Sequence, residues 1–239
     1  MLRRPRKPRQ RVIVALDVTG EDELVRLVRL LSSRVGMFKI GKELFTSLGP
    51  RAVSLVRERG GEVFLDLKYH DIPNTVAGAV RAAANLGVSM LTIHASGGSK
   101  MIRAAAEAAE EAQDPPAIIA VTLLTSLGQA DVDDLGFGGS PQDVVMRLAA
   151  LSLAAGADGL VTSPREVRSL RREHGKEPLL ITPGVRPAGS AAGDQARFAT
   201  PAQAVKAGAD FLVIGRPITK DPDPAAAAGR IAEELAENA

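Results

Sequence analysis

The sequence contains no cysteine and no tryptophan, and aromatic residues make up only 3% of its 239 residues. The absence of cysteine excludes disulfide bonds, thiolate nucleophiles, iron–sulfur clusters and cysteine-ligated zinc sites. It also fits a reducing compartment, so we expect a cytoplasmic protein. No apolar run approaches the roughly 18 residues of a membrane span, and the N-terminus lacks the apolar core of a signal peptide. We therefore expect neither membrane insertion nor secretion.

An excess of positive charge is confined to the N-terminus. The formal net charge is +2, but residues 1–11 hold six basic residues and no acidic one, so the rest of the chain is net acidic. Few aromatic side chains are available to stack on bases, and we therefore expect no nucleic-acid partner. We expect residues 1–11 to form a disordered basic arm and residues 12–239 to form a single folded domain.

Short apolar runs of strand length alternate with segments of helical period along the chain. The runs are rich in β-branched residues or leucine and do not alternate with polar residues, which is typical of parallel strands covered on both faces. They span residues 12–17, 37–40, 62–68, 89–94, 117–124, 159–162, 179–182 and 211–214. This pattern predicts an α/β fold with a single (β/α)8 TIM barrel, because a doubly wound sheet more often stops at five or six strands.

Several helix starts carry local signals. A hydroxyl residue followed by proline occurs at Ser140, Ser163 and Thr200, and we expect each to cap a helix whose first residue is the proline. A further amphipathic helix is expected over residues 21–35, with Thr19 in its start signal.

Charged and polar residues gather where the predicted strands end. The active sites of TIM barrels lie at the carboxyl ends of the strands and in the loops that follow. The residues at these positions are Asp17, Lys39, Asp66, Lys68, Asp71, Thr125, Arg186, Gly215 and Arg216. Any one of them alone would more often be a loop charge or a helix cap, but their joint placement on one rim favours a functional site.

The third predicted strand is the most informative. Its period of two directs Phe64, Asp66 and Lys68 to one face and the intervening leucines to the other. Asp66 and Lys68 then point into the barrel mouth, where unpaired charges cost several kcal/mol. Together with Lys39 and Asp71 they can form a series of alternating sign that keeps a lysine protonated and aimed. An ion-pair network that only closes the barrel top is the alternative.

The motifs around these residues resemble those of one enzyme family. The segment Asp66-Leu67-Lys68-Tyr69-His70-Asp71-Ile72-Pro73-Asn74-Thr75 is similar to the signature of the orotidine 5′-phosphate decarboxylases. The resemblance extends over nearly the whole chain from residue 12. It includes Ala15-Leu16-Asp17, Phe38-Lys39-Ile40-Gly41, Val121-Thr122-Leu123-Leu124-Thr125-Ser126, Thr182-Pro183-Gly184-Val185-Arg186 and Ile214-Gly215-Arg216-Pro217-Ile218.

The resemblance implies catalytic roles for four residues. Lys68 would donate a proton to C6 of the pyrimidine as CO2 leaves, and Asp66 would lie against the departing carboxylate. Lys39 and Asp71 would complete the charge network. The resemblance also implies a homodimer in which Asp71, Ile72 and Thr75 are contributed across a two-fold interface, and a reaction that needs no cofactor or metal.

The resemblance assigns substrate binding to the other strand ends. Asp17 and Lys39 would bind the ribose hydroxyls, and Thr125 would lie near the pyrimidine edge. Arg186, Gln195, Gly215 and Arg216 would surround the phosphate, in agreement with the usual phosphate site after strands seven and eight of such barrels. Residues 185–199 lack helical or strand periodicity, and we expect this loop to be a lid that closes over phosphate through Gln195.

Other interpretations remain open. His70 and His94 could suggest a metal pair, but no third ligand is evident, and we expect no metal site. The nearest alternative function is a Mg²⁺-dependent sugar-phosphate decarboxylase or synthase, whose relatives share an Asp-x-Lys-x-x-Asp core but carry Ala-Gly-Glu where this chain has residues 72–75. A catalytically silent phosphate sensor that uses the basic arm to contact RNA or membrane is less favoured. A Schiff-base aldolase that uses Lys68 is also less favoured, because the flanking aspartates should keep that lysine charged.

Overall fold

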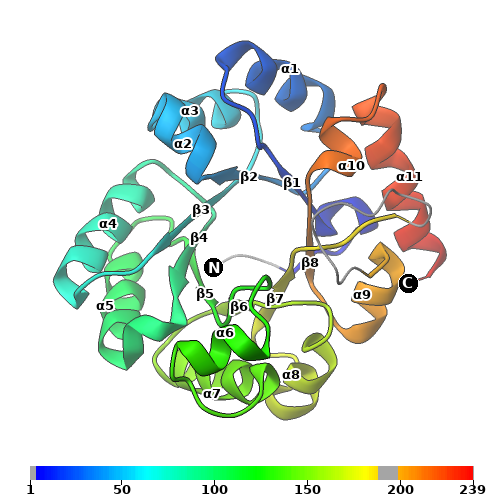
Figure 1. Ribbon diagram of the computed structural model, residues 1–239. Coiled ribbons are helices and arrows are strands. Elements are labelled where there is room, and N and C mark those ends of the chain that lie inside the picture. The colour runs from blue at the N-terminus through cyan, green and yellow to red at the C-terminus, as the bar shows by residue number, and fades with distance from the viewer. Residues whose placement is uncertain (1–3, 188–198, 239) are drawn as a thin grey trace.

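The computed structural model describes residues 4–187 and 199–238. Eight parallel strands close into a barrel in the order β1 to β8, and helices surround the strands as an outer ring (Figure 1). This confirms the predicted (β/α)8 fold. The strands are β1 (Val12–Ala15), β2 (Met37–Gly41), β3 (Val63–Tyr69), β4 (Met90–His94), β5 (Ala117–Val121), β6 (Gly159–Val161), β7 (Leu179–Thr182) and β8 (Phe211–Ile214).

The α-helices lie between consecutive strands or follow the last one. The α-helices are α1 (Glu21–Leu31), α2 (Lys42–Leu48), α3 (Arg51–Arg57), α4 (Pro73–Asn85), α5 (Gly98–Glu110), α6 (Gln129–Asp134), α7 (Pro141–Ala154), α8 (Val167–His174), α9 (Pro201–Ala207), α10 (Arg216–Thr219) and α11 (Pro224–Glu237). Two 3-10 helices are η1 (Pro8–Arg11) and η2 (Ala95–Gly97). No helix among the described residues combines the length and apolarity needed to cross a membrane.

Two apolar cores result from the alternation of side chains along each strand. A small cluster fills the inside of the barrel and contains one or two residues from most strands, among them Ile13, Phe64 and Ile181. A larger cluster packs the outer faces of the strands against the helices, and Leu65 and Leu180 belong to it. Because inward positions recur every second residue, the residues that follow the inner cluster along β2 and β3 also face the barrel axis. These residues are Lys39 and Asp66.

Some boundaries differ from the prediction. β1 ends at Ala15 and β5 ends at Val121, so Asp17 and Thr125 lie in loops beyond the last ladder contacts. The helix expected over residues 21–35 ends at Leu31, and its N-cap is Gly20 rather than Thr19. The chain then turns, and Val35 is buried without belonging to the helix.

Two of the three predicted hydroxyl caps are confirmed. Ser140 and Thr200 accept hydrogen bonds from the backbone N–H of Asp143 and Gln203, both at 3.2 Å. The prediction at Ser163 is wrong, because α8 begins only at Val167. The Ser163 hydroxyl instead donates to the Glu166 carboxylate, and the Glu166 N–H bonds the Ser163 carbonyl at 3.2 Å in a turn.

The described part of the basic arm is ordered against the base of the barrel, which differs from the disorder expected for residues 1–11. Arg4 pairs with Asp210, and its guanidinium also donates to the carbonyls of Glu177 and Pro178 at 2.9 and 3.1 Å. Arg11 donates to the carbonyls of Ala209 and Asp210, each at 3.3 Å. These acceptors lie near the amino ends of β7 and β8, and such long-range partners leave no local signal in the sequence.

Candidate active site

Three charged side chains converge at the carboxyl ends of β2 and β3. The Lys68 ammonium donates a hydrogen bond to Asp66 Oδ1 at 2.7 Å, and Lys39 Nζ lies 3.6 Å from Asp66 Oδ2. Lys39 also lies 3.5 Å from Asp17 Oδ1. The side chains of Lys39 and Asp66 are only 12% and 13% exposed, whereas that of Asp17 is 56% exposed. The result is a series of alternating charge that runs from the solvent-exposed Asp17 to the partly buried Lys68.

Asp66 is ionised because its neighbours outweigh its burial. Burial raises the pKa of this carboxyl group, but the charges of Lys39 and Lys68, together with hydrogen bonds from Lys68 and Thr92, bring the pKa below its ordinary value of 3.8. A carboxylate that accepts hydrogen bonds beside two cations is stable as an anion even with little solvent contact. The site therefore holds a fixed negative charge between two ammonium groups at neutral pH.

A cavity of about 170 Å³ opens over this cluster. Its charged wall consists of Lys39, Asp66 and Lys68, and Thr125 contributes a hydroxyl. The remaining lining is mostly apolar and comes from β3 and from the strands and loops on the other side of the barrel: Phe64, Val121, Leu123, Leu124, Val161, Ile181, Pro183 and Val213. Charges at one wall of an otherwise apolar cavity act in a medium of low dielectric constant, where electrostatic effects are large.

The residues predicted to bind phosphate lie near the ends of β7 and β8. Arg186 is 9% exposed, and its backbone N–H donates to the Ala199 carbonyl at 3.0 Å. Gly215 follows β8, and a Cβ placed there would lie 3.3 Å from Asp17 Oδ2, so this position faces the barrel mouth. Arg216 begins α10 and is exposed. Gln195, and with it residues 188–198 of the predicted lid over residues 185–199, lies outside the described residues.

Asp71, Ile72 and Thr75 are not part of the cluster within this chain. All three are exposed in the turn after β3 and in the first turn of α4, and Ile72 is 67% exposed. The Asp71 carboxylate accepts a hydrogen bond from the Ile72 N–H at 2.6 Å. One chain thus brings together three of the four residues of the predicted charge network, with Asp17 as an additional acid.

Sequence reasoning missed Thr92 of β4. This residue is fully buried, and its hydroxyl donates to Asp66 Oδ1 at 3.0 Å while the hydroxyl oxygen accepts the Lys68 N–H at 2.9 Å. The sequence did carry a signal for Thr92, because Met90, Thr92 and His94 share the inward face of an otherwise apolar strand.

His94 contacts His70 with ring centroids 5.4 Å apart. Across residues 4–187 and 199–238, no group of three or more side chains is arranged to hold a metal ion.

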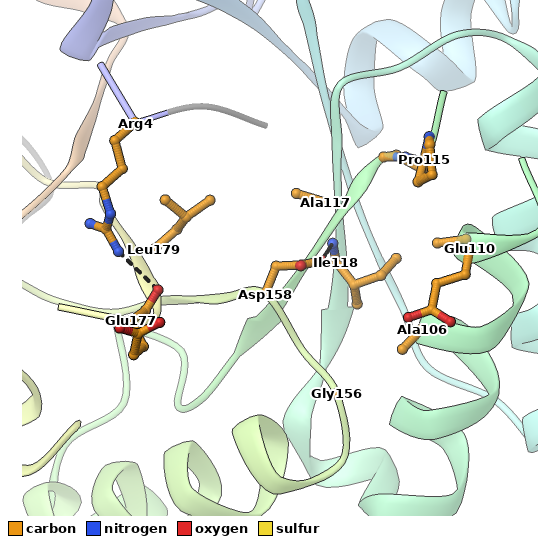
Figure 2. A pocket seen from close by; sticks show the side chains of 12 residues that line it. Arg4, Ala106, Glu110, Pro115, Ala117, Ile118, Gly156, Asp158, Glu177 and Leu179 are labelled. Carbon is orange, nitrogen blue, oxygen red and sulfur yellow. Dashed lines mark hydrogen bonds between the residues drawn. The ribbon is translucent and has the colours of Figure 1, made fainter. Parts of the chain in front are cut away.

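A second and larger cavity, of about 330 Å³, lies at the opposite end of the barrel near the amino ends of β5 and β7. Figure 2 shows Arg4 on one side of it and Glu110 on the other, with Asp158 between them. The Ile118 N–H donates to Asp158 Oδ2 at 2.8 Å, and burial raises the pKa of Asp158. None of the rim residues named above lines this cavity.

Fold and site together define a (β/α)8-barrel protein with a cavity at the carboxyl ends of its strands. One wall of the cavity is charged and the rest is mostly apolar. The carboxyl ends of the strands are the usual place of catalysis in this architecture. A family model described as "Orotidine 5'-phosphate decarboxylase / HUMPS family" matches residues 10–231. The chain belongs to this family.

Similar proteins carry the name of one activity. The orotidine 5′-phosphate decarboxylase of Halorhodospira halophila is 54% identical over 226 residues, which cover 95% of this chain and 96% of that protein. The protein of the same name from Moorella thermoacetica is 53% identical over 95% of this chain and 92% of its own length. The crystal structure of orotidine 5′-phosphate decarboxylase from Lactobacillus acidophilus matches with a TM-score of 0.83 and 38% identity, over 98% of this chain and 99% of that one.

Proposed function

We propose that this chain converts orotidine 5′-phosphate to UMP and carbon dioxide at the rim cavity, which is the last step of de novo UMP synthesis. Family membership and the names of relatives at about half identity support this activity. The observation that carries the proposal within the structure is the 2.7 Å ion pair between Lys68 Nζ and Asp66 Oδ1 beside an apolar cavity.

The reaction breaks the bond between C6 of the pyrimidine and the carboxylate carbon. The electron pair stays on C6 in an sp² orbital perpendicular to the ring π system, so delocalisation into an electron sink gives little direct help. We assign to Lys68 the proton that C6 takes up as CO2 departs, and solvent returns a proton to the lysine after the product leaves. Because the ammonium is positioned before the reaction, it stabilises negative charge that develops only in the transition state.

Asp66 has two parts in this assignment. Its carboxylate holds the Lys68 ammonium by the 2.7 Å hydrogen bond, and it faces the place where the substrate carboxylate must leave. Lys39, 3.6 Å from the same carboxylate and 3.5 Å from Asp17, limits the repulsion between the two anions. Asp17 and Lys39 are also assigned to the ribose hydroxyls. This arrangement makes loss of the substrate's negative charge favourable inside a largely apolar cavity.

The substrate phosphate is assigned to the loops after β7 and β8. Arg186, Gln195, Gly215 and Arg216 are its proposed partners, and Thr125 is assigned to the pyrimidine edge. The position of these residues supports the assignment, because phosphate sites of TIM barrels recur at these two loops. Guanidinium groups also bind phosphate through bidentate hydrogen bonds. Binding energy from the phosphate can then contribute to closing the site over the ring, with the lid over residues 185–199 as the closing segment.

A homodimer completes the proposed site. Asp71, Ile72 and Thr75 are assigned to the active site of the neighbouring subunit, across a two-fold axis. Their exposure in the isolated chain supports this assignment, since a 67% exposed isoleucine beside an exposed carboxylate suits an interface better than bulk solvent. The cysteine-free composition and the biosynthetic reaction support a cytoplasmic location.

Purified protein treated with excess EDTA tests the proposed activity. Ultraviolet absorbance should report loss of orotidine 5′-phosphate at the same rate with and without EDTA, and chromatography should find UMP as the product. The alternative within the family is a Mg²⁺-dependent reaction on a sugar phosphate. Turnover of orotidine 5′-phosphate that is absent, or that EDTA abolishes and Mg²⁺ restores, would contradict the proposal.

A further inference from the structure

The end of β3 departs from regular strand geometry at the residues that carry the charges. Leu65 pairs with Leu91 and Tyr69 pairs with Ile93, so three residues of β3 lie opposite the single residue Thr92 of β4. This is a bulge with two extra residues. Lys68 has a φ of 54°, and among the described residues it is the one residue other than glycine with a positive φ.

A lysine in this backbone region costs about 1–2 kcal/mol, because its Cβ crowds the following carbonyl oxygen. Such a conformation persists only where the surroundings hold it in place. The bulge also removes the Lys68 N–H from the regular ladder between β3 and β4. The unfavourable φ of Lys68 and its backbone N–H, which lies outside the ladder, therefore both need compensating contacts from the adjoining strand β4.

The hydroxyl group of Thr92 is the hydrogen-bond partner that the Lys68 N–H would otherwise lack. Its oxygen accepts the Lys68 N–H at 2.9 Å, and its proton goes to Asp66 Oδ1 at 3.0 Å. The same carboxylate oxygen accepts the Lys68 ammonium at 2.7 Å. The three hydrogen bonds form a closed ring through the backbone and side chain of Lys68, the hydroxyl of Thr92 and the carboxylate of Asp66. Because Thr92 is fully buried, its hydroxyl is shielded from water that could compete for its two bonds.

We infer that Thr92 is a positioning residue of the decarboxylation: its hydroxyl fixes the bulge, the left-handed backbone of Lys68 and the orientation of the Asp66 carboxylate, so that ammonium and carboxylate are aimed before substrate binds. The inference rests on the proposed function. Thr92 acts through Lys68 and Asp66 and touches no reacting atom. A role confined to packing would instead depend on the volume of the side chain and leave the hydroxyl dispensable.

Thr92→Val separates the hydroxyl from the volume, because the two side chains have nearly the same shape. We expect kcat to fall by about 10- to 100-fold, as for a lost buried hydrogen-bond partner that aligns a reacting group. KM and the Kd of UMP should change less than threefold. Thr92→Ser keeps the hydroxyl and should retain kcat within threefold of wild type.

Thr162→Val is the matched control. Thr162 is 1% exposed, and within the described part of the chain its hydroxyl has no hydrogen-bond partner. This variant should keep kcat, KM and thermal stability close to wild type. If Thr92→Val does not fold, Thr92→Ala and Thr92→Ser provide the same comparison, since both lack the methyl group and only serine keeps the hydroxyl.

Amide hydrogen exchange at Lys68 gives a readout that does not need turnover. The Lys68 N–H should exchange faster in Thr92→Val than in wild type and should remain protected in Thr92→Ser. Wild-type protein that fails to turn over orotidine 5′-phosphate would overturn the proposed function, and the catalytic role of Thr92 with it. Wild-type turnover combined with an unchanged kcat in Thr92→Val, or with equal losses in the serine and valine variants, would overturn the inference alone.

Discussion

Asp66 lies between two lysines, and the balance among these three charges determines how the site responds to acid. Burial alone would raise the pKa of Asp66, yet Lys39, Lys68 and the hydrogen bonds from Lys68 and Thr92 bring it below 3.8. A carboxyl group with a lowered pKa in the folded state stabilises that state above its unfolded pKa. This contribution is lost as pH falls from about 4 through the folded-state pKa.

The variant Asp66→Asn tests this charge balance. At pH 7 it should lower the free energy of unfolding by about 1–3 kcal/mol, because two partly buried ammonium groups lose their shared counter-charge. The difference from wild type should shrink as the pH falls from about 4 through the folded-state pKa, where wild type loses the advantage of its ionised carboxylate. Urea denaturation across this pH range measures both effects. A difference that stays constant with pH would contradict the assigned pKa direction.

At the scale of single elements, most of the fold follows from patterns that the sequence displays. Eight apolar runs gave eight strands, and those over residues 179–182 and 211–214 have the predicted bounds. The period of two along β3 correctly separated Asp66 from Leu65 and Leu67. The bulge could not be predicted in this way, because the backbone conformation of Lys68 depends on a hydroxyl contributed by another strand. The prediction of a helix cap at Ser163 was wrong because its hydroxyl bonds the Glu166 carboxylate instead.

Closure of the barrel between β6 and β7 depends on a residue without a side chain. Gly159 pairs with Leu179, and a Cβ at Gly159 would lie 2.4 Å from the Leu179 carbonyl oxygen. Gly159→Ala should therefore force the two strands apart and destabilise the protein by about 1–3 kcal/mol. Gly229→Ala in α11 is the control, since a Cβ there meets no atom within 4 Å. It should be neutral or stabilise by up to about 1 kcal/mol.

Thermal or urea denaturation of the two alanine variants measures the contrast. Equal stabilities of Gly159→Ala and Gly229→Ala would show that the strands tolerate a side chain at this position. The sequence marked Gly159 only as the first residue of an apolar run, so the close contact with β7 came from the structure.

At the scale of the whole molecule, the charged cluster of the candidate site and the contacts that hold the N-terminal arm lie at opposite ends of the barrel. The rim carries Lys39, Asp66 and Lys68, whereas the base carries the network in which Asp210 binds Arg4 and Arg171. The base network holds the N-terminal arm and the amino end of β7, where the Leu180 N–H donates to Asp210 at 2.8 Å. Such a separation is usual for TIM barrels, in which the two faces serve activity and stability.

An active site shared between two subunits can be tested by mixing two variants that are each inactive alone. Lys68→Ala and Asp71→Asn should each be inactive as homodimers if Asp71 serves the partner's site. When the two variants are mixed and allowed to exchange subunits, one site of each mixed dimer carries both changes and the other carries neither. Activity should then recover to about a quarter of wild type, because half of the dimers are mixed and each has one intact site. No recovery after proven subunit exchange would contradict a shared site.

The most direct test of the central claim is the turnover of orotidine 5′-phosphate by Lys68→Ala, measured together with the affinity of this variant for UMP. We expect kcat to fall by about a thousandfold or more, because the proposed proton donor and the fixed positive charge are both removed. We also expect UMP binding to persist, since the proposed phosphate and ribose contacts lie elsewhere. A Lys68→Ala enzyme with a tenth or more of wild-type kcat would contradict the role proposed for Lys68.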